Sequence, residues 1–401
     1  MHHFSCCRFL SSCQAGLWVL VFLFAGGITG HAQSDSTTWF QRTKANYEAK
    51  KERKLAAGQV MFTPVVAPAY TPELGLLVAA GGLITFKTNK NDSLIQRSSL
   101  PGSIGYTTTG ALVINGILTS FWFKDKLRIN GDFWYKDMPD HYWGVGFDNG
   151  LNVPKSDSTT AYNRTWWWIN PRFLYQVKTH YFVGLNVDYN YTQGTSPSAG
   201  VDQDSVYQHY NNRPMNGGLG VILRYDTRDV PVDARKGLLL DFRAVAYSQG
   251  LGGDNNFQTY RLDYRQFVTL KKPGHTLAWQ FKTRLAFGEV PYGEMSQLGT
   301  PFDLRGYQWG RYRNDHMVYL LTEYRHSFYR PDQKKSLHGA AVWVGAGSVF
   351  NNDEFEQNRM EWLPNVGLGY RFEVQPRMNV RIDYGFGLKS SGFYFNFNQA
   401  F

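Results

Sequence analysis

The sequence contains very little cysteine. Its 401 residues include three cysteines, Cys6, Cys7 and Cys13, and all of them lie near the amino terminus. If this segment is removed during export, the remaining chain has no thiol, which excludes disulfide bonds and cysteine chemistry from the mature protein. Cys13 precedes the apolar part of the segment, so its position does not match that of a lipoprotein acceptor.

Long apolar runs are also missing. After residue 32, no stretch approaches the roughly 18 apolar residues that a membrane-spanning helix needs. The first 32 residues have the pattern of a cleaved export signal, with Arg8, a short apolar core at 17–24 and a small-x-small site at Gly30-His31-Ala32. We therefore predict a signal peptide at 1–32. The alternative, a short membrane anchor, is disfavoured by the short apolar core.

Catalytic motifs are absent from the sequence as well. It has no nucleophile elbow, no zinc-protease motif and no phosphate-binding loop, and its ten histidines are scattered. We expect no enzyme activity, cofactor or metal. The net charge of +10 would suit a nucleic-acid partner. However, the charges are spread over alternating segments. This distribution indicates that they line a water-filled lumen and the membrane rims, and that nucleic acid is not a partner.

The sequence is rich in aromatic residues, and many of its segments alternate between apolar and polar residues. Aromatics make up 16% of the chain, more than a soluble enzyme of this size normally carries. Residues 377–389 place Ile382, Tyr384 and Phe386 on one face of an extended segment, and Arg381 and Asp383 on the other. Residues 260–271 and 276–288 repeat the pattern. Such runs reach about ten to fourteen residues, as a tilted crossing of a bilayer requires, whereas strands of soluble sheets average about five or six.

We count about sixteen such runs and predict an all-β fold, a transmembrane antiparallel β-barrel over residues 59–401. The long links at 137–160, 194–213, 290–314 and 351–360 fall on one side of the barrel, and the tight links at 271–274 and 374–377 fall on the other. This asymmetry is typical of outer-membrane barrels, with short turns in the periplasm. Residues 33–58 form a short charged segment, interpreted as a periplasmic tail or, alternatively, a helix that plugs the lumen.

Three sequence features indicate a family. Leu304-Arg305-Gly306-Tyr307 lies in the long link before the twelfth run, and Asp226-Thr227-Arg228-Asp229 lies in a turn with Gly237 following. The last segment is aromatic and is predicted to place four phenylalanines on one face: Phe393, Phe395, Phe397 and Phe401. Over roughly residues 60–401 the chain resembles the BamA/TamA family of outer-membrane assembly and translocation proteins. The aromatic end also resembles the targeting signal that the barrel assembly machinery reads.

The resemblance implies roles for these residues. Arg305 would point from a loop folded into the lumen toward an acid on the inner wall, with Glu323 as the candidate partner; the alternative is an ordinary solvated arginine. The family usually adds a second acid on the next strand, in a pattern like F-x-D-x-G, and this sequence has Gly345 where that acid is expected. For Asp226, Arg228, Asp229 and Gly237 we favour a structural periplasmic turn, in which Asp and Arg pair with each other, over a partner-docking site.

Two functions follow as expectations. The first is insertion or translocation of polypeptides at the Gram-negative outer membrane, through a weak seam between the first and last strands, where Pro64 and Pro68 cannot donate ladder hydrogen bonds. Its partners would be outer-membrane lipid and either unfolded outer-membrane protein clients or a separate periplasmic partner. The sequence shows no POTRA modules before the barrel, although the family's assembly members carry them. The second is a passive channel or structural barrel whose inward cations favour anions: Lys282, Arg284, Arg261, Arg265, Arg377 and Arg381.

Overall fold

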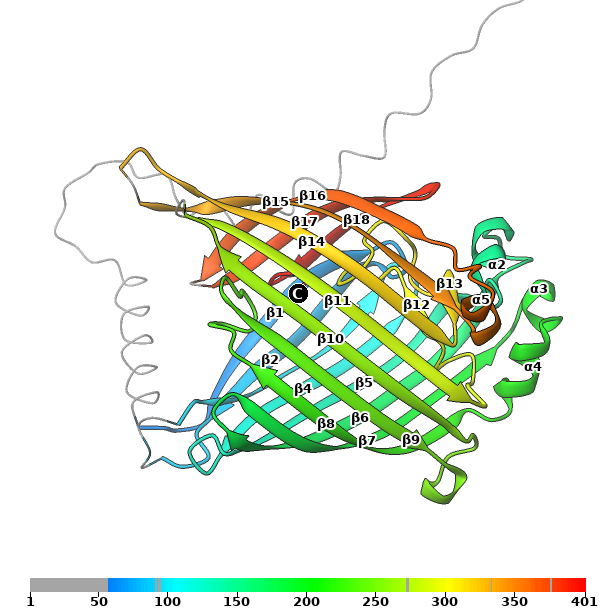
Figure 1. Cartoon of the computed structure of the whole chain (residues 1–401), viewed down its shortest axis with the longest axis horizontal. Coiled ribbons are helices and arrows are strands. Elements are labelled where there is room, and N and C mark those ends of the chain that lie inside the picture. The colour runs from blue at the N-terminus through cyan, green and yellow to red at the C-terminus, as the bar shows by residue number, and fades with distance from the viewer. Residues whose placement is uncertain (1–56, 91, 93–94, 272–273, 333, 376) are drawn as a thin grey trace, which may run out of the picture. The chain divides into compact units, whose positions relative to one another are not determined.

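In the computed structural model, sixteen strands close into one antiparallel barrel (Figure 1). The structure describes residues 57–401 except 91, 93–94, 272–273, 333 and 376. The predicted signal peptide and nearly all of the charged segment lie outside the described residues. Among the described residues, no helix is long and apolar enough to cross a membrane.

Each barrel strand is hydrogen-bonded to the next barrel strand along the chain, with β11 pairing with β14, and β1 closes on β18. A small sheet of β12 and β13 lies in the link between β11 and β14. The strands are β1 Met61–Thr71, β2 Gly75–Phe86, β3 Ser98–Thr107, β4 Leu112–Trp122, β5 Leu127–His141, β6 Ala161–Lys178, β7 Tyr181–Thr195, β8 Met215–Asp226, β9 Gly237–Tyr247, β10 Phe257–Thr269, β11 His275–Gly288, β12 Ser296–Leu298, β13 Tyr312–Asn314, β14 His316–Tyr329, β15 Lys335–Phe350, β16 Leu363–Gln375, β17 Met378–Gly387 and β18 Ser390–Phe397.

The predicted alternation places apolar side chains outside and polar ones inside. On β17, Tyr384 and Phe386 are exposed on the outer surface, whereas Arg381 and Asp383 are fully buried in the lumen. On β11, Phe287 faces outward and Gln280 is buried. A strand sends successive side chains to opposite faces, so each of these segments has one apolar wall and one polar wall. The prediction of the fold from this period is confirmed.

The two ends of the barrel differ (Figure 1). The links at 142–160, 196–214, 289–315 and 351–362 gather at one end, here called the loop end, and they carry the helices α2 Phe147–Asn152, α3 Ala199–Asp202, α4 Ser205–Asn211 and α5 Asn352–Glu356. The opposite end, here called the turn end, has tight connections such as 123–126 and 179–180. A 3-10 turn, Gln249–Leu251, lies in the loop-end link 248–256. The barrel strands range from 8 residues in β18 to 18 in β6, a wider range than the predicted ten to fourteen.

The closing contact between β1 and β18 is short. These strands share one register pair, Tyr70↔Phe395. In contrast, β17 and β18 pair from Val380↔Phe397 to Gly387↔Ser390, and β1 pairs with β2 along its whole length. Most of the β1 edge that faces β18 therefore has no ladder, and this junction is called the seam below.

Candidate functional site

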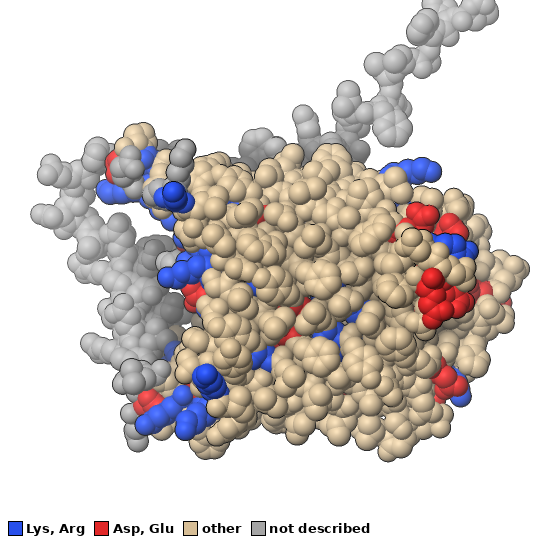
Figure 2. Space-filling view, viewed as in Figure 1, with Lys and Arg blue, Asp and Glu red and all other residues tan. Residues whose placement is uncertain are grey.

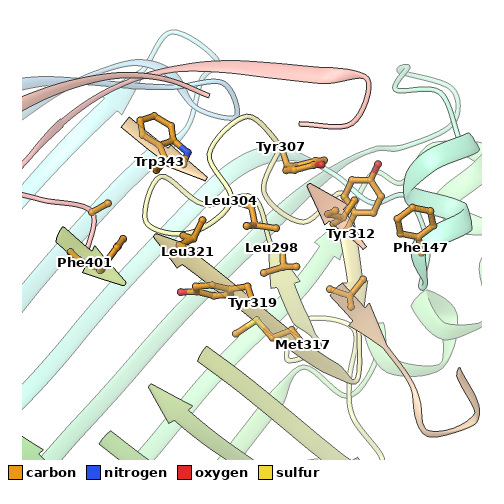
Figure 3. Close-up of a cluster of buried hydrophobic side chains, with 14 of the residues drawn as sticks. Phe147, Leu298, Leu304, Tyr307, Tyr312, Met317, Tyr319, Leu321, Trp343 and Phe401 are labelled. Carbon is orange, nitrogen blue, oxygen red and sulfur yellow. The ribbon is translucent and has the colours of Figure 1, made fainter. Parts of the chain in front are cut away.

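The link 289–315 folds back into the barrel lumen, where its apolar side chains pack on the inner wall (Figure 3). Leu298, Leu304 and Tyr312 of this link, here called the lumen loop, are completely buried. They belong to one cluster with Leu321 of β14 and Trp343 of β15. Burying side chains of this size contributes about 1.5–3 kcal/mol each, so the lumen loop is part of the folded core of the barrel.

Asp303 sets the turn that presents Arg305. Its carboxylate accepts hydrogen bonds from the backbone N–H groups of Gly299, Thr300 and Leu304, and from the Thr300 hydroxyl. Burial raises the pKa of Asp303, and these donors oppose the shift. Gly306 then has a φ of 116°, which favours glycine because a side chain is strained there. The backbone reverses within a few residues and directs Arg305 at the wall.

Arg305 joins two carboxylates on different strands. Its Nη2 lies 2.7 Å from Glu323 Oε2 of β14, and its Nη1 lies 2.7 Å from Asp383 Oδ2 of β17. All three side chains are fully buried. The guanidinium also stacks on Trp343, 3.5 Å from the ring centroid. A planar, permanently charged group is suited to bridge two carboxylates and stack at once.

More arginines surround these two acids. Glu323 Oε1 accepts from Arg325 at 2.7 Å, and Asp383 Oδ1 accepts from Arg371 at 2.6 Å. Arg381 Nη1 is 3.2 Å from Asp383. Each carboxylate is therefore shared by several cations, which compensates for the loss of solvent around a buried charge.

Backbone contacts lock the same part of the loop against β17. A Cβ on Gly385 would lie 2.1 Å from the Arg305 carbonyl oxygen, so only glycine permits this approach. The Tyr394 hydroxyl accepts from the Gly306 N–H at 2.9 Å and donates to the Tyr307 carbonyl oxygen at 3.2 Å. The Tyr307 hydroxyl donates to the Pro364 carbonyl oxygen at 2.6 Å. Leu304, Arg305, Gly306 and Tyr307 thus each have a defined partner on the wall.

The other side of the lumen loop contacts the first hairpin and β5. The Trp309 N–H donates to Glu73 Oε1 at 2.9 Å, and Glu73 lies in the turn between β1 and β2. Burial raises the pKa of Glu73, although this hydrogen bond opposes the shift. The Trp309 ring lies 4.6 Å from Lys136 Nζ of β5, which also faces the rings of Trp134 and Trp166. The lumen loop therefore bridges the barrel from β14–β17 to β5 and the first hairpin.

The pairing of Arg305 with Glu323 follows the sequence expectation, but the expected second position does not supply an acid. A Cβ on Gly345 would lie 2.3 Å from the Leu320 carbonyl oxygen, so β15 packs closely against β14 at this point. The second acid is Asp383 of β17. Its own sequence, Ile382-Asp383-Tyr384-Gly385, has the expected x-D-x-G spacing on the polar face, and this signal could have identified it. No motif or alternation in the sequence points to the roles of Trp343 and Tyr394.

The turn at 226–237 forms a compact unit at the turn end of the lumen. Asp226 and Arg228 pair with each other at 2.8 Å, as the structural interpretation expects. Gly237 has a φ of 96°, and a Cβ there would lie 2.2 Å from the Thr227 carbonyl oxygen. Asp229 pairs with Arg377, which comes from the turn between β16 and β17. These contacts connect two turns that are far apart in the sequence.

The four terminal phenylalanines do not share one face, and the prediction is wrong for Phe401. Phe393 is exposed on the outer surface, and Phe395 and Phe397 are partly exposed in β18. β18 ends at Phe397, and Asn398 has a φ of 63°, so the chain leaves the strand direction. Phe401 lies in the lumen at 4% exposure, where its carbonyl oxygen accepts from Arg325 at 2.9 Å. Alternation stops where the strand ends.

Comparisons with known proteins agree with this geometry. The Omp85 superfamily domain matches residues 103–401. Among solved structures, a BamA from Haemophilus ducreyi lacking POTRA domains 1–3 is similar at 14% identity and a TM-score of 0.57, over 89% of this chain and 78% of that one. No curated protein matches the sequence.

Two CdiB structures share the fold as well. The Acinetobacter baumannii protein has 13% identity and a TM-score of 0.50, over 84% of this chain and 59% of that one. The Escherichia coli protein has 10% identity and a TM-score of 0.53, over 83% and 62%. This chain thus spans about three fifths of each CdiB. The match to the superfamily domain covers most of the barrel, including the lumen loop, and the chain belongs to the Omp85 superfamily.

Proposed function

We propose that this barrel assists the insertion or translocation of polypeptides at the Gram-negative outer membrane, without catalysing a chemical reaction. The observation that carries the proposal is the seam, where one register pair replaces the long ladders found between the other strands. Each backbone hydrogen bond contributes about 0.5–1.5 kcal/mol net in water, so the seam costs far less to open than any other junction.

An open seam would expose two strand edges to a client. Unpaired backbone N–H and C=O groups on an edge bind an extended segment by adding it as a further strand. The exposed edge of β1 also contains Pro64 and Pro68, which lack the N–H needed for ladder pairing. The client in this proposal is an unfolded outer-membrane protein segment, delivered by a separate periplasmic partner at the turn end.

Locking the seam tests this mechanism. The variant Tyr70→Cys with Phe395→Cys places two thiols directly opposite each other, since these residues are register partners. We expect oxidation to join β1 to β18 and to abolish complementation in a depleted strain of the native host, with recovery after reduction. The readout is the abundance of other outer-membrane proteins, measured by quantitative proteomics.

The matched control is Val221→Cys with Ala244→Cys, which joins β8 to β9 at another register pair. It introduces the same chemistry at a junction that remains closed in the proposed mechanism, so oxidation should leave complementation intact. Normal levels of every other outer-membrane protein after depletion would refute the function itself. Normal complementation by the oxidised seam variant would refute only the seam.

A passive anion-favouring channel is less well supported. Most of the inward cations that motivated it are paired with acids: Arg265 with Asp263 at 2.7 Å, Arg377 with Asp229 and Asp233, and Arg381 with Asp383. Arg261 and Arg284 also have carboxylate partners, at 3.4 Å each. Paired arginines contribute little net field to a passing ion, so this lumen gives anions little preference.

Conductance in a planar bilayer separates the two functions. We expect the unaltered barrel to show small, flickering conductance because the lumen loop crosses it, and we expect conductance to rise when Arg305 becomes Ala. A large, steady and anion-selective conductance of the unaltered barrel would instead support the channel.

A further inference from the structure

Exposed basic residues surround the turn end of the barrel. In Figure 2, blue side chains gather at this end and red ones at the loop end, on either side of a largely uncharged band. Seven of the exposed cations lie in the links β2–β3, β4–β5, β8–β9, β10–β11 and β14–β15, and Lys178 ends β6 beside the link β6–β7: Lys90, Lys124, Lys126, Lys178, Lys236, Lys271, Arg330 and Lys334. This set is called the basic ring.

Few exposed acids neutralise the basic ring. At the turn end the exposed acids among the described residues are Asp229 and Asp332, which pair with Arg377 and Lys334. In the loop-end links the balance is reversed, because the exposed cations are Lys155, Arg359 and Lys389, whereas the exposed acids are Asp148, Asp157, Asp202, Glu289, Asp353, Glu356 and Glu361. The charge of the barrel surface is therefore polarised along its axis.

The basic ring directly borders the apolar outer surface. Exposed Trp122 and Phe123 precede Lys124, and exposed Leu270 precedes Lys271. Farther along each strand the outward side chains are aliphatic, such as Leu223, Val342 and Leu368, each about half exposed. Lysine at such a border extends its charged end to the level of lipid headgroups while its methylene stem stays on apolar surface.

We propose that the basic ring binds the headgroups of anionic phospholipids in the leaflet that surrounds the turn end. The cations recur in successive links around the circumference, and a leaflet touches all of them at once, whereas a folded protein would cover one sector. Anionic headgroups attract basic residues held near the membrane surface. This inference concerns lipid and holds whether the barrel inserts polypeptides or conducts ions.

Tryptophan quenching by brominated lipid tests the proposal, since Trp122 lies two residues from Lys124. The barrel is reconstituted in phosphatidylcholine vesicles that contain either brominated phosphatidylglycerol or brominated phosphatidylcholine. We expect the brominated phosphatidylglycerol to associate about fivefold more strongly, as about 1 kcal/mol of attraction per basic residue implies. Salt at high concentration should remove the preference because it screens exposed charges.

Two variants with the same number of changes identify the surface responsible. The ring variant carries Gln at Lys124, Lys126, Lys178, Lys271 and Lys334, and it should lose the preference. The control variant carries Asn at Asp148, Asp157 and Asp202 and Gln at Glu356 and Glu361, and it should keep the preference. Equal quenching by the two lipids in the unaltered barrel, or an unchanged preference in the ring variant, would overturn the proposal. Either result would indicate that the basic ring binds an acidic protein and not lipid headgroups. The salt measurement needs no variant, so the test stands even if one fails to fold.

Discussion

Replacing Arg305 with Ala is expected to destabilise the barrel by about 3 kcal/mol, near the lower end of the roughly 3–5 kcal/mol lost when a buried ion pair is broken. The lower end applies because Arg325 and Arg371 still pair with Glu323 and Asp383. The loss also removes the stacking on Trp343. Urea-dependent tryptophan fluorescence of the refolded barrel measures the change.

Lysine at position 305 should not restore stability. Its single ammonium group cannot hold carboxylates on β14 and β17 and stack on an indole at the same time. Arg359→Ala is the control, since Arg359 is exposed on the loop after α5, and changes there usually stay within about 0.5 kcal/mol. Unfolding of the Arg305→Ala barrel at the same urea concentration as the unaltered one would show that the buried ion pairs do not hold the loop.

Gly385→Ala is the second change with a large expected effect. A Cβ there would lie 2.1 Å from the Arg305 carbonyl oxygen and 2.5 Å from its carbonyl carbon, both backbone atoms that cannot rotate away. Either β17 or the lumen loop must move, at a cost of roughly 1–3 kcal/mol, as overpacking in a core typically shows. We expect the loop to detach, and trypsin to cleave after Arg305 in a barrel that otherwise stays folded.

Gly116→Ala on β4 is the matched control, because a Cβ at Gly116 meets no other atom within 4 Å. Gel mobility before and after heating reports whether the barrel itself remains closed. If trypsin cleaves the two glycine variants and the unaltered barrel to the same extent, the close approach of Gly385 to Arg305 does not decide whether the loop stays docked.

The sequence predicts the wall of this barrel better than its interior. Alternation with a period of two places Tyr384 outside and Asp383 inside without knowledge of the neighbouring strands, because the strand itself determines both faces. The lengths of the links between strands likewise distinguish the loop end of the barrel from the turn end. These properties are local, and the structure confirms them.

The partners of the lumen loop depend on which strands meet it after closure, and local patterns do not contain that information. Asp383 is on the expected polar face, yet its pairing with Arg305 arises because the loop crosses to β17. The inward course of Phe401 begins at the left-handed Asn398, where alternation no longer applies. The hydrogen bond from Trp309 to Glu73 joins residues more than two hundred positions apart.

That last hydrogen bond joins the first hairpin to the lumen loop. A movement that carries the β1–β2 turn away from the loop must either break the contact between Glu73 and Trp309 or shift the loop with it. Coupling of this kind is reciprocal, so each site changes the other's equilibrium by the same factor. A nanobody that binds the exposed part of 289–315 at the loop end should therefore alter how readily the first hairpin moves, although it contacts neither β1 nor β18.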